Sequence, residues 1–249
     1  MGAGMITIGL AGAAGSGKSS AAEYLVERYG FIHFSFSDAL YREVAEAFGL
    51  ENEDLLRDRA TKEVETPLLA LSECRNREFA DLCAWAQCDA TRRQLAGGYM
   101  AEFAAPRSPR LILQRWGTNY RRAQDPDYWI KKAEAWLETI LQAAPYPELR
   151  PQLFVCSSVR FENEREWIKD PNGSIWHLRR FNAAPVHAHE SENELPVLEG
   201  ERVIYNNYTL DYLHRGVDQL LSSSAKFVRM EPPLPMTAPE LIADVEGRN

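Results

Sequence analysis

Three features of the sequence predict an α/β fold with a parallel sheet and helices on both of its faces. Short apolar, β-branched runs alternate with helical patterns along most of the chain. A glycine-rich loop joins the first apolar run, residues 5–10, to a helical stripe over residues 19–29. This loop has the pattern Gly12-x-x-x-x-Gly17-Lys18-Ser19, which is typical of phosphate-binding loops. Strands that alternate with helices behind such a loop favour a parallel sheet covered on both sides.

The loop itself predicts a site for a nucleoside triphosphate. Its glycines allow the backbone to approach phosphates closely, and its N–H groups with the following helix N-terminus form an anion site. Lys18 is expected to reach the β- and γ-phosphates of ATP, and the Ser19 hydroxyl to hold Mg²⁺. The expected ATP-binding residues are Gly12, Ala13, Ala14, Gly15, Ser16, Gly17, Lys18, Ser19 and Ser20.

Composition limits the classes of protein to which the chain can belong. With 249 residues and 45% hydrophobic content, the chain can form one domain with insertions or at most two domains. A net charge of −8 argues against stable nucleic-acid binding, although a local basic groove stays open. The four cysteines show no C-x-x-C spacing, so buried, reduced thiols are expected. The absence of a leader pattern and of long apolar runs predicts a cytoplasmic protein with no membrane partner.

Further strands and helices are predicted after the loop in the sequence. Strands are expected over residues 31–36, 153–156, 174–178 and 202–205, and a helix is expected to start at Pro109 and run toward Gly117. The resulting organisation is a core domain over residues 1–221, a helical insertion at about 61–105, and an extended tail over residues 222–249.

Polar clusters follow the predicted strands, where ligands of open parallel sheets bind. Four arginines stand at or just beyond these strand ends, and a guanidinium group offers the planar fork of donors that phosphoryl groups need. They are Arg42, Arg122, Arg160 and Arg180. His187 and His189 have the spacing of half a metal site, but loop histidines are the expected interpretation.

In these clusters the chain resembles the bacteriophage deoxynucleoside monophosphate kinases, a branch of the P-loop nucleoside monophosphate kinases. The resemblance covers roughly residues 5–220 in order. Its motifs here are Ser108-Pro109-Arg110, Leu113-Gln114, Gly117-Thr118, Arg122, Asp125-Pro126, Trp129, Arg160-Phe161, Asn163-Glu164, His189, Ser191-Glu192, Val203-Ile204 and Asn206.

The resemblance implies a three-layer P-loop kinase fold. It also implies ATP- and Mg²⁺-dependent phosphorylation of a deoxynucleoside monophosphate by a homodimer, in the host cytoplasm if the gene is phage-encoded. Lys18, Arg122, Arg160 and Arg180 are then the expected catalytic residues, and a loop over residues 181–195 is expected to close over the site. The expected acceptor-binding residues are Asp38, Arg42, Gly117, Thr118, Trp129, Glu164, His189 and Glu192.

Two departures from the family pattern keep alternatives open. Ser158 stands where the family has Asp, and Tyr41 where it has Lys, with Arg42 next to it. The nearest alternative is a kinase that phosphorylates hydroxymethyluracil within phage DNA, and the others are a dephospho-coenzyme A kinase and a non-catalytic nucleotide-binding switch. The DNA alternative depends on a local basic groove formed by Arg75, Arg77, Arg92 and Arg93.

Overall fold

A computed structural model describes residues 5–87, 96–143, 152–170, 172–181 and 194–223. The chain divides into two compact units. The first unit consists of Met1–Phe36 and Ile130–Asn249, and the second is Ser37–Trp129, which includes the stretch expected to be a helical insertion. None of the helices in the described ranges is long and apolar enough to cross a lipid bilayer.

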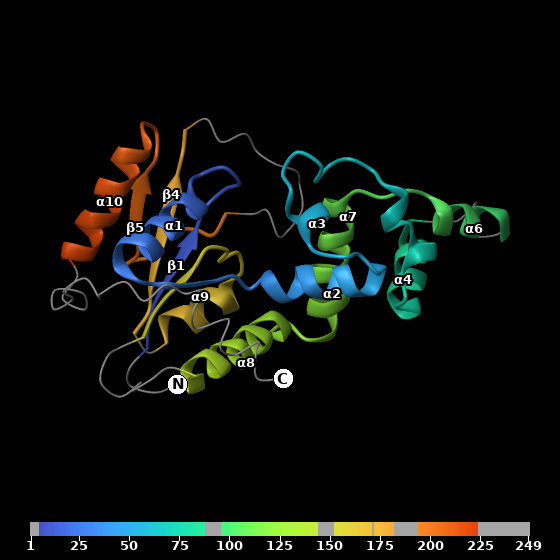
Figure 1. The fold of residues 1–249 in the computed structure, drawn as a ribbon, viewed down its shortest axis with the longest axis horizontal. Helices are drawn as coiled ribbons and strands as arrows, with labels where there is room; N and C mark the ends of the chain where they lie inside the picture. The colour runs from blue at the N-terminus through green and yellow to red at the C-terminus, as the bar shows by residue number, and fades with distance from the viewer. Residues whose placement is uncertain (1–4, 88–95, 144–151, 171, 182–193, 224–249) are drawn as a thin grey trace. The chain divides into compact units, whose positions relative to one another are not determined.

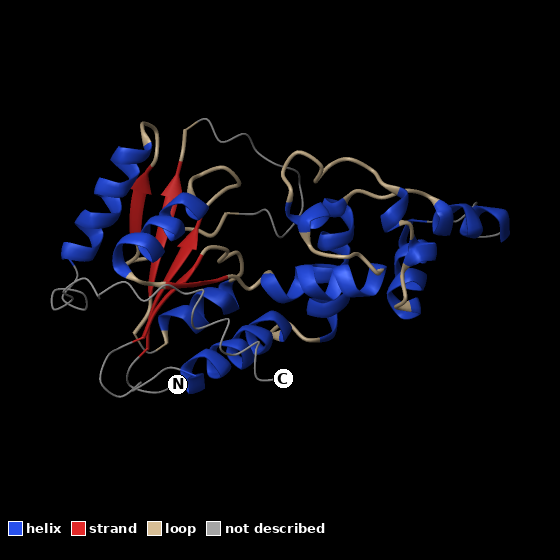
Figure 2. Ribbon diagram, viewed as in Figure 1, coloured by secondary structure: helices blue, strands red, loops and turns tan. Residues whose placement is uncertain are grey.

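The first unit is built on a five-stranded sheet with the strand order β2-β3-β1-β4-β5. Every pair of neighbouring strands is parallel, so all carboxyl ends lie at one edge (Figure 2). This topology confirms the predicted fold class. The strands are β1 (Met5–Ala11), β2 (Ile32–Phe34), β3 (Gln152–Cys156), β4 (Ser174–Arg179) and β5 (Arg202–Tyr205).

Helices cover both faces of this sheet (Figure 1). Ile8 and Leu10 point to the same face because strand side chains alternate, and they are fully buried with residues of α1 (Lys18–Tyr29) and α10 (Leu210–Ser223). On the other face, α9 (Glu162–Lys169) packs against β1 and β4. The helix approaches so closely that a Cβ atom at Gly9 of β1 would lie 3.1 Å from the side chain of Ile168 in α9.

The second unit is helical in its described residues. Its core is aromatic: the Phe79 ring lies 4.6 Å from the Trp116 ring, measured between centroids, and 6.4 Å from the Phe48 ring. The helices are α2 (Asp38–Phe48), α3 (Asp54–Arg57), α4 (Arg77–Gln87), α6 (Ala96–Ala104) and α7 (Pro109–Gln114), followed by a π-helix (Arg115–Arg122), while α8 (Tyr128–Ala143) begins here and continues into the first unit.

The π-helix differs from the sequence prediction, which expected an α-helix to run toward Gly117. Trp116 and Arg121 both donate to the same carboxylate oxygen of Glu43, each at a distance of 3.0 Å. Residues five apart in an α-helix are separated by about 140° around its axis, so they cannot easily reach one acceptor. The wider π-turn brings both donors to Glu43, and this long-range contact explains the change of helix type.

The described cysteines are buried and free, as predicted. Burial raises the pKa of Cys83 to about 11 and that of Cys156 to about 12. Both thiols are therefore protonated at neutral pH and serve as core residues, while Cys88 lies outside the described residues.

Candidate active site

The glycine-rich loop lies between the end of β1 and the start of α1, at the carboxyl edge of the sheet. Gly12, Gly15 and Gly17 have φ angles of 134°, 77° and 104°, which other residues rarely adopt. Space is limiting as well: a Cβ atom would lie 2.2 Å from the Leu178 carbonyl oxygen at Gly12 and 2.3 Å from the Asn206 side-chain nitrogen at Gly17. Both ends of the loop therefore require glycine.

Lys18 is the first residue of α1, and its ammonium group folds back over the loop. Its Nζ atom donates to the carbonyl oxygens of Gly12 at 2.6 Å and Ala13 at 2.8 Å. The next residue, Ser19, is exposed, as a residue that contacts a ligand or its metal must be. Ser16 is 1% exposed, and its hydroxyl oxygen has no hydrogen-bond partner among the described residues.

These groups fit the phosphates of a nucleotide. The loop offers backbone N–H groups, a helix N-terminus and a lysine cation, and phosphate oxygens would give the buried Ser16 hydroxyl a partner. Mg²⁺ that arrives with a nucleotide keeps water and phosphate ligands and needs few protein atoms. The exposed Ser19 hydroxyl can provide one of them.

A carboxylate already lies on this anion-binding loop. Glu194 Oε1 accepts a hydrogen bond of 3.1 Å from the backbone N–H of Ala13, although 181 positions separate the two residues. The segment that follows Glu194 is anchored to α9, because the Arg165 guanidinium donates to the Pro196 carbonyl oxygen at 2.6 Å. The sequence analysis predicted no contact between Glu194 and the loop, because an acidic residue in a loop gives no local signal of such a contact.

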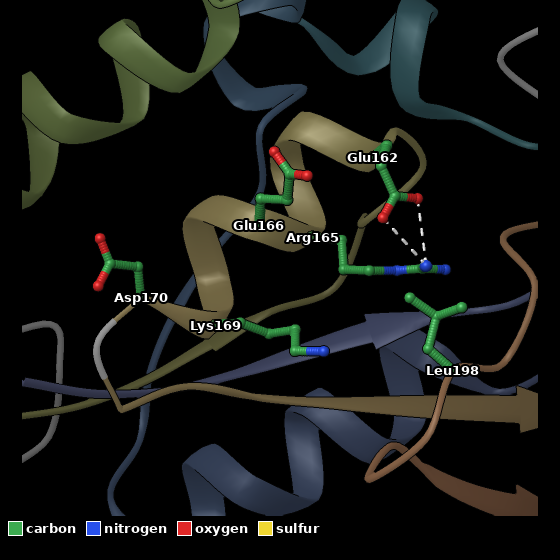
Figure 3. Close-up of a pocket in the computed structure, with 6 residues that line it drawn as sticks. All are labelled: Glu162, Arg165, Glu166, Lys169, Asp170 and Leu198. Atoms are coloured by element: carbon green, nitrogen blue, oxygen red, sulfur yellow. Dashed lines mark hydrogen bonds and ion pairs between the residues drawn. The ribbon is translucent and has the colours of Figure 1, made fainter.

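Charged side chains of α9 surround this anchor. Figure 3 shows Arg165 paired with Glu162, with Leu198 beside them. These residues line an open pocket of about 520 Å³. Glu201 contacts this segment as well: it accepts a hydrogen bond from the Leu198 N–H at 2.9 Å and pairs with His177 at 2.7 Å. Burial by itself raises the pKa of Glu201, but the hydrogen bonds of Leu198 and His177 and the charge of Arg165 outweigh it and lower that pKa. The network therefore holds residues 194–201 through an ionised carboxylate.

Two predicted site residues follow β3 in the sequence. Arg160 is exposed in the loop between β3 and α9. Glu164 is 3% exposed, and its carboxylate accepts from the backbone N–H groups of Arg160 at 2.8 Å and Phe161 at 3.2 Å. Glu164 thus fixes the loop that carries Arg160. Nearby, the hydroxyl oxygens of Ser158 and Ser35 lie 2.5 Å apart.

The ends of β4 and β5 also reach this edge. Arg180 follows β4 directly and is exposed. Asn206 follows β5 directly, and its amide donates to the Ser16 carbonyl oxygen at 3.0 Å. His189 and Glu192 lie outside the described residues, as does most of the loop predicted over residues 181–195.

The remaining predicted residues lie in the second unit, on α2, on the π-helix and at the start of α8. Asp38 begins α2, and its carboxylate pairs with Arg57 at 3.2 Å. Arg42 is exposed on the same helix. Trp129 is 4% exposed and donates to the Gly117 carbonyl oxygen at 3.1 Å, so it supports the π-helix from the core. The π-helix contains Gly117, Thr118 and Arg122.

Glu43 holds the π-helix, and the sequence analysis did not identify it. It accepts hydrogen bonds from Trp116 and Arg121 of the π-helix and from the Tyr128 hydroxyl. Burial opposes ionisation, but the hydrogen bonds from Tyr128 and Trp116 and the charge of Arg121 prevail and lower the pKa of Glu43. The Arg121 guanidinium also lies 4.9 Å from the ring centroids of Tyr120 and Tyr128.

Comparison with known proteins agrees with this site. A family model described as an AAA domain matches residues 11–81, a range that begins at the phosphate-binding loop. A curated protein of Acanthamoeba polyphaga mimivirus, named "Putative deoxynucleotide monophosphate kinase", is 26% identical over 231 residues, which cover 89% of this chain and 99% of that protein. Together with the parallel sheet and the loop at its carboxyl edge, these similarities support placing the chain among the P-loop kinases.

Proposed function

We propose that this protein is a deoxynucleoside monophosphate kinase, which transfers the γ-phosphate of ATP to the 5′-phosphate of a deoxynucleoside monophosphate and releases ADP. The observation that carries the proposal is the glycine loop at the end of the central strand, with Lys18 at the first position of α1. The name of the mimivirus relative and the family motifs support the choice of acceptor. Membership of the phage branch, a homodimer and a cytoplasmic location are part of the proposal.

The donor site is assigned to the first unit. Loop N–H groups and Lys18 would hold the β- and γ-phosphates, and Ser19 would hold the Mg²⁺ that comes with ATP and neutralises phosphate charge. To reach a phosphate, the Lys18 ammonium must leave the carbonyl oxygens of Gly12 and Ala13. Arg160 and Arg180, both exposed near the same sheet edge, would neutralise the group in transfer.

The acceptor residues are assigned mainly to the second unit. Asp38 and Arg42 on α2, with Thr118 and Arg122 on the π-helix, are the proposed contacts. π-helical turns occur frequently at functional sites, which supports this assignment. Trp129 and Gly117 shape the π-helix, and Glu164 orients the loop of Arg160. His189 and Glu192 are proposed as further contacts.

A screen of acceptors tests the proposal against its alternatives. ADP release would be measured with each deoxynucleoside monophosphate, with dephospho-coenzyme A, and with a duplex that contains hydroxymethyluracil, between about 50 and 200 mM salt, because duplex binding weakens steeply over this range. Turnover with one or more of the monophosphates and little change with salt is expected. Activity on the duplex alone, lost as salt rises, would establish the DNA kinase instead, and ATP binding without turnover would indicate a switch protein.

One arginine of the groove on which the DNA alternative depends contacts the end of α2, and its side chain stays exposed. Arg75, one of the four arginines of the postulated groove, donates through its side chain to the Glu46 carbonyl oxygen at 3.4 Å and through its backbone to that of Ala47 at 2.8 Å. It is therefore used to complete the carboxyl end of α2. Arg77 is exposed, and Arg92 and Arg93 lie outside the described residues.

A further inference from the structure

Asn206 is fixed on both its backbone and its side chain. Its backbone N–H donates to the Arg179 carbonyl oxygen at 2.8 Å, which holds it at the carboxyl edge beside the end of β4. Its side-chain nitrogen donates to the Ser16 carbonyl oxygen at 3.0 Å, across 190 positions of sequence. Asn206 is 9% exposed, so this hydrogen bond is shielded from solvent.

The amide and the loop fit each other closely. A Cβ atom on Gly17 would lie 2.3 Å from the Asn206 side-chain nitrogen and 3.4 Å from Leu213 of α10. The absence of a side chain at position 17 therefore gives Asn206 room to reach Ser16. Two requirements, a positive φ angle and a close neighbour, select glycine at the same place.

The hydrogen bond determines which way one peptide unit of the loop faces. In a planar trans peptide the C=O and N–H bonds point in opposite directions. Because the Ser16 carbonyl points to Asn206, the Gly17 N–H points away from Asn206. In the part of the chain that the structure describes, this N–H makes no hydrogen bond, so it is available to an anion.

We propose that Asn206 is a positioning residue for the donor phosphates, which acts by holding the Ser16–Gly17 peptide with its N–H toward the anion site. This inference rests on the proposed function, since it takes the loop to be the site of ATP. It assigns Asn206 no contact with the substrate. The donor character of the amide is essential, because a carboxylate in its place could only accept hydrogen bonds at neutral pH.

Two substitutions at Asn206 and one matched control test the proposal. Asn206→Ala removes the donor, and Asn206→Asp also sets a negative charge against the Ser16 carbonyl oxygen. Asn207→Asp is the control, because it adds the same charge one residue further along. Asn207 uses its Oδ1 atom to accept from the Phe181 N–H at 2.9 Å, and aspartate keeps that acceptor.

The measurements are MgATP affinity by calorimetry, the Michaelis constants of both substrates, and the midpoint of thermal unfolding. We expect Asn206→Asp to weaken MgATP binding by about 10- to 100-fold, as for loss of a buried hydrogen bond with added repulsion, and Asn206→Ala by about 5- to 20-fold. The Michaelis constant of the acceptor should stay within about twofold in both variants, and Asn207→Asp should bind MgATP within about twofold of the wild type.

Each other outcome contradicts a specific part of the argument. Wild-type affinity in both Asn206 variants, or an equal loss in Asn207→Asp, would overturn the positioning role. The positioning role would also be overturned if Asn206→Ala weakened the binding of both substrates alike and lowered the unfolding midpoint, since that result indicates general destabilisation. Failure of the wild-type protein to bind MgATP would instead overturn the proposed function on which the inference rests.

Discussion

The phosphate-binding loop of the first unit and the π-helix of the second unit both carry residues predicted to contact substrates, but different forces hold them. The loop is held by backbone geometry, with glycine at positions 12 and 17, and by two donors to its carbonyl oxygens. These are the Asn206 amide on Ser16 and the Lys18 ammonium on Gly12 and Ala13. The π-helix is held by an ionised carboxylate, Glu43. The difference shows that the loop depends mainly on its own glycine backbone, whereas the π-helix depends on a carboxylate that lies far from it in the sequence.

The first prediction concerns the loop and has the largest expected effect. Lys18→Ala should lower turnover by about 10²- to 10³-fold, because a positioned cation at the transferring phosphate contributes several kcal/mol to the transition state. The fold should persist, since the Lys18 side chain is only partly buried and donates to carbonyl oxygens of the loop itself. Steady-state turnover and the unfolding midpoint measure the two effects.

An exposed lysine on α8 provides the control for that variant. Lys132→Ala removes an equal charge from the same unit and should leave turnover within about twofold of the wild type. Near wild-type turnover in Lys18→Ala would show that this loop is not the donor site.

The second prediction tests the dependence of the π-helix on charge. The lowered pKa of Glu43 means that its ionised form stabilises the folded unit above the ordinary carboxyl pKa of 4.5, and that this contribution is lost as pH falls through the lower pKa of the folded state. Glu43→Gln should therefore cost about 1–3 kcal/mol at neutral pH and should remove that part of the acid sensitivity. Thermal unfolding between about pH 7 and pH 3.5 would measure both.

Glu46 lies on the same helix and supplies the control. Its side chain is exposed, and Glu46→Gln should shift stability by no more than about 0.5 kcal/mol. If Glu43→Gln keeps the stability and the acid sensitivity of the wild type, the carboxylate is not what holds the π-helix.

The two sites also differ in how far the sequence could predict them. The loop was predictable because its glycines, its lysine and the flanking strand and helix lie within 25 consecutive residues. The π-helix was not, because its cause is a carboxylate 73 positions before Trp116 and 78 before Arg121. In the sequence Glu43 is one more polar residue of an amphipathic helix.

Within the first unit, too, local features could be predicted from the sequence and long-range contacts could not. All five strands were predicted with their ends within two residues, although β2 is shorter than the predicted strand over 31–36, since apolar runs are local features. Arg160 and Arg180 follow the strands as expected, but the contacts of Glu194 and Asn206 with the loop span 181 and 190 positions. A local sequence pattern predicts that a residue follows a strand, but it does not predict the loop atom with which that residue forms a hydrogen bond.

A third prediction refines the metal side of the loop. Ser158 stands where the resembling family has Asp, and its hydroxyl lies 2.5 Å from that of Ser35, a group that can also donate to a carboxylate. Ser158→Asp should keep activity and lower the Mg²⁺ concentration at half-maximal turnover, by up to about tenfold, because a carboxylate is a hard oxygen ligand. A Mg²⁺ titration measures this, with Ser157→Asp as the neighbouring control. Loss of activity in Ser158→Asp alone would place the position away from the metal.

The last and smallest prediction asks whether the charge of Glu194 affects ATP binding at the loop. The Glu194 carboxylate accepts from the Ala13 N–H, where it repels an incoming phosphate and occupies one loop donor. At exposed positions such a charge contributes only about 1 kcal/mol, so Glu194→Gln should lower the Michaelis constant of ATP by about two- to fivefold. Glu199→Gln, in the same exposed segment, should change this Michaelis constant little.

Because salt screens exposed charges, the gain in Glu194→Gln should shrink between about 50 and 500 mM salt. A gain that persists at high salt would mean that Glu194 blocks the loop by its hydrogen bond, and an increased Michaelis constant would mean that it helps to shape the loop for ATP.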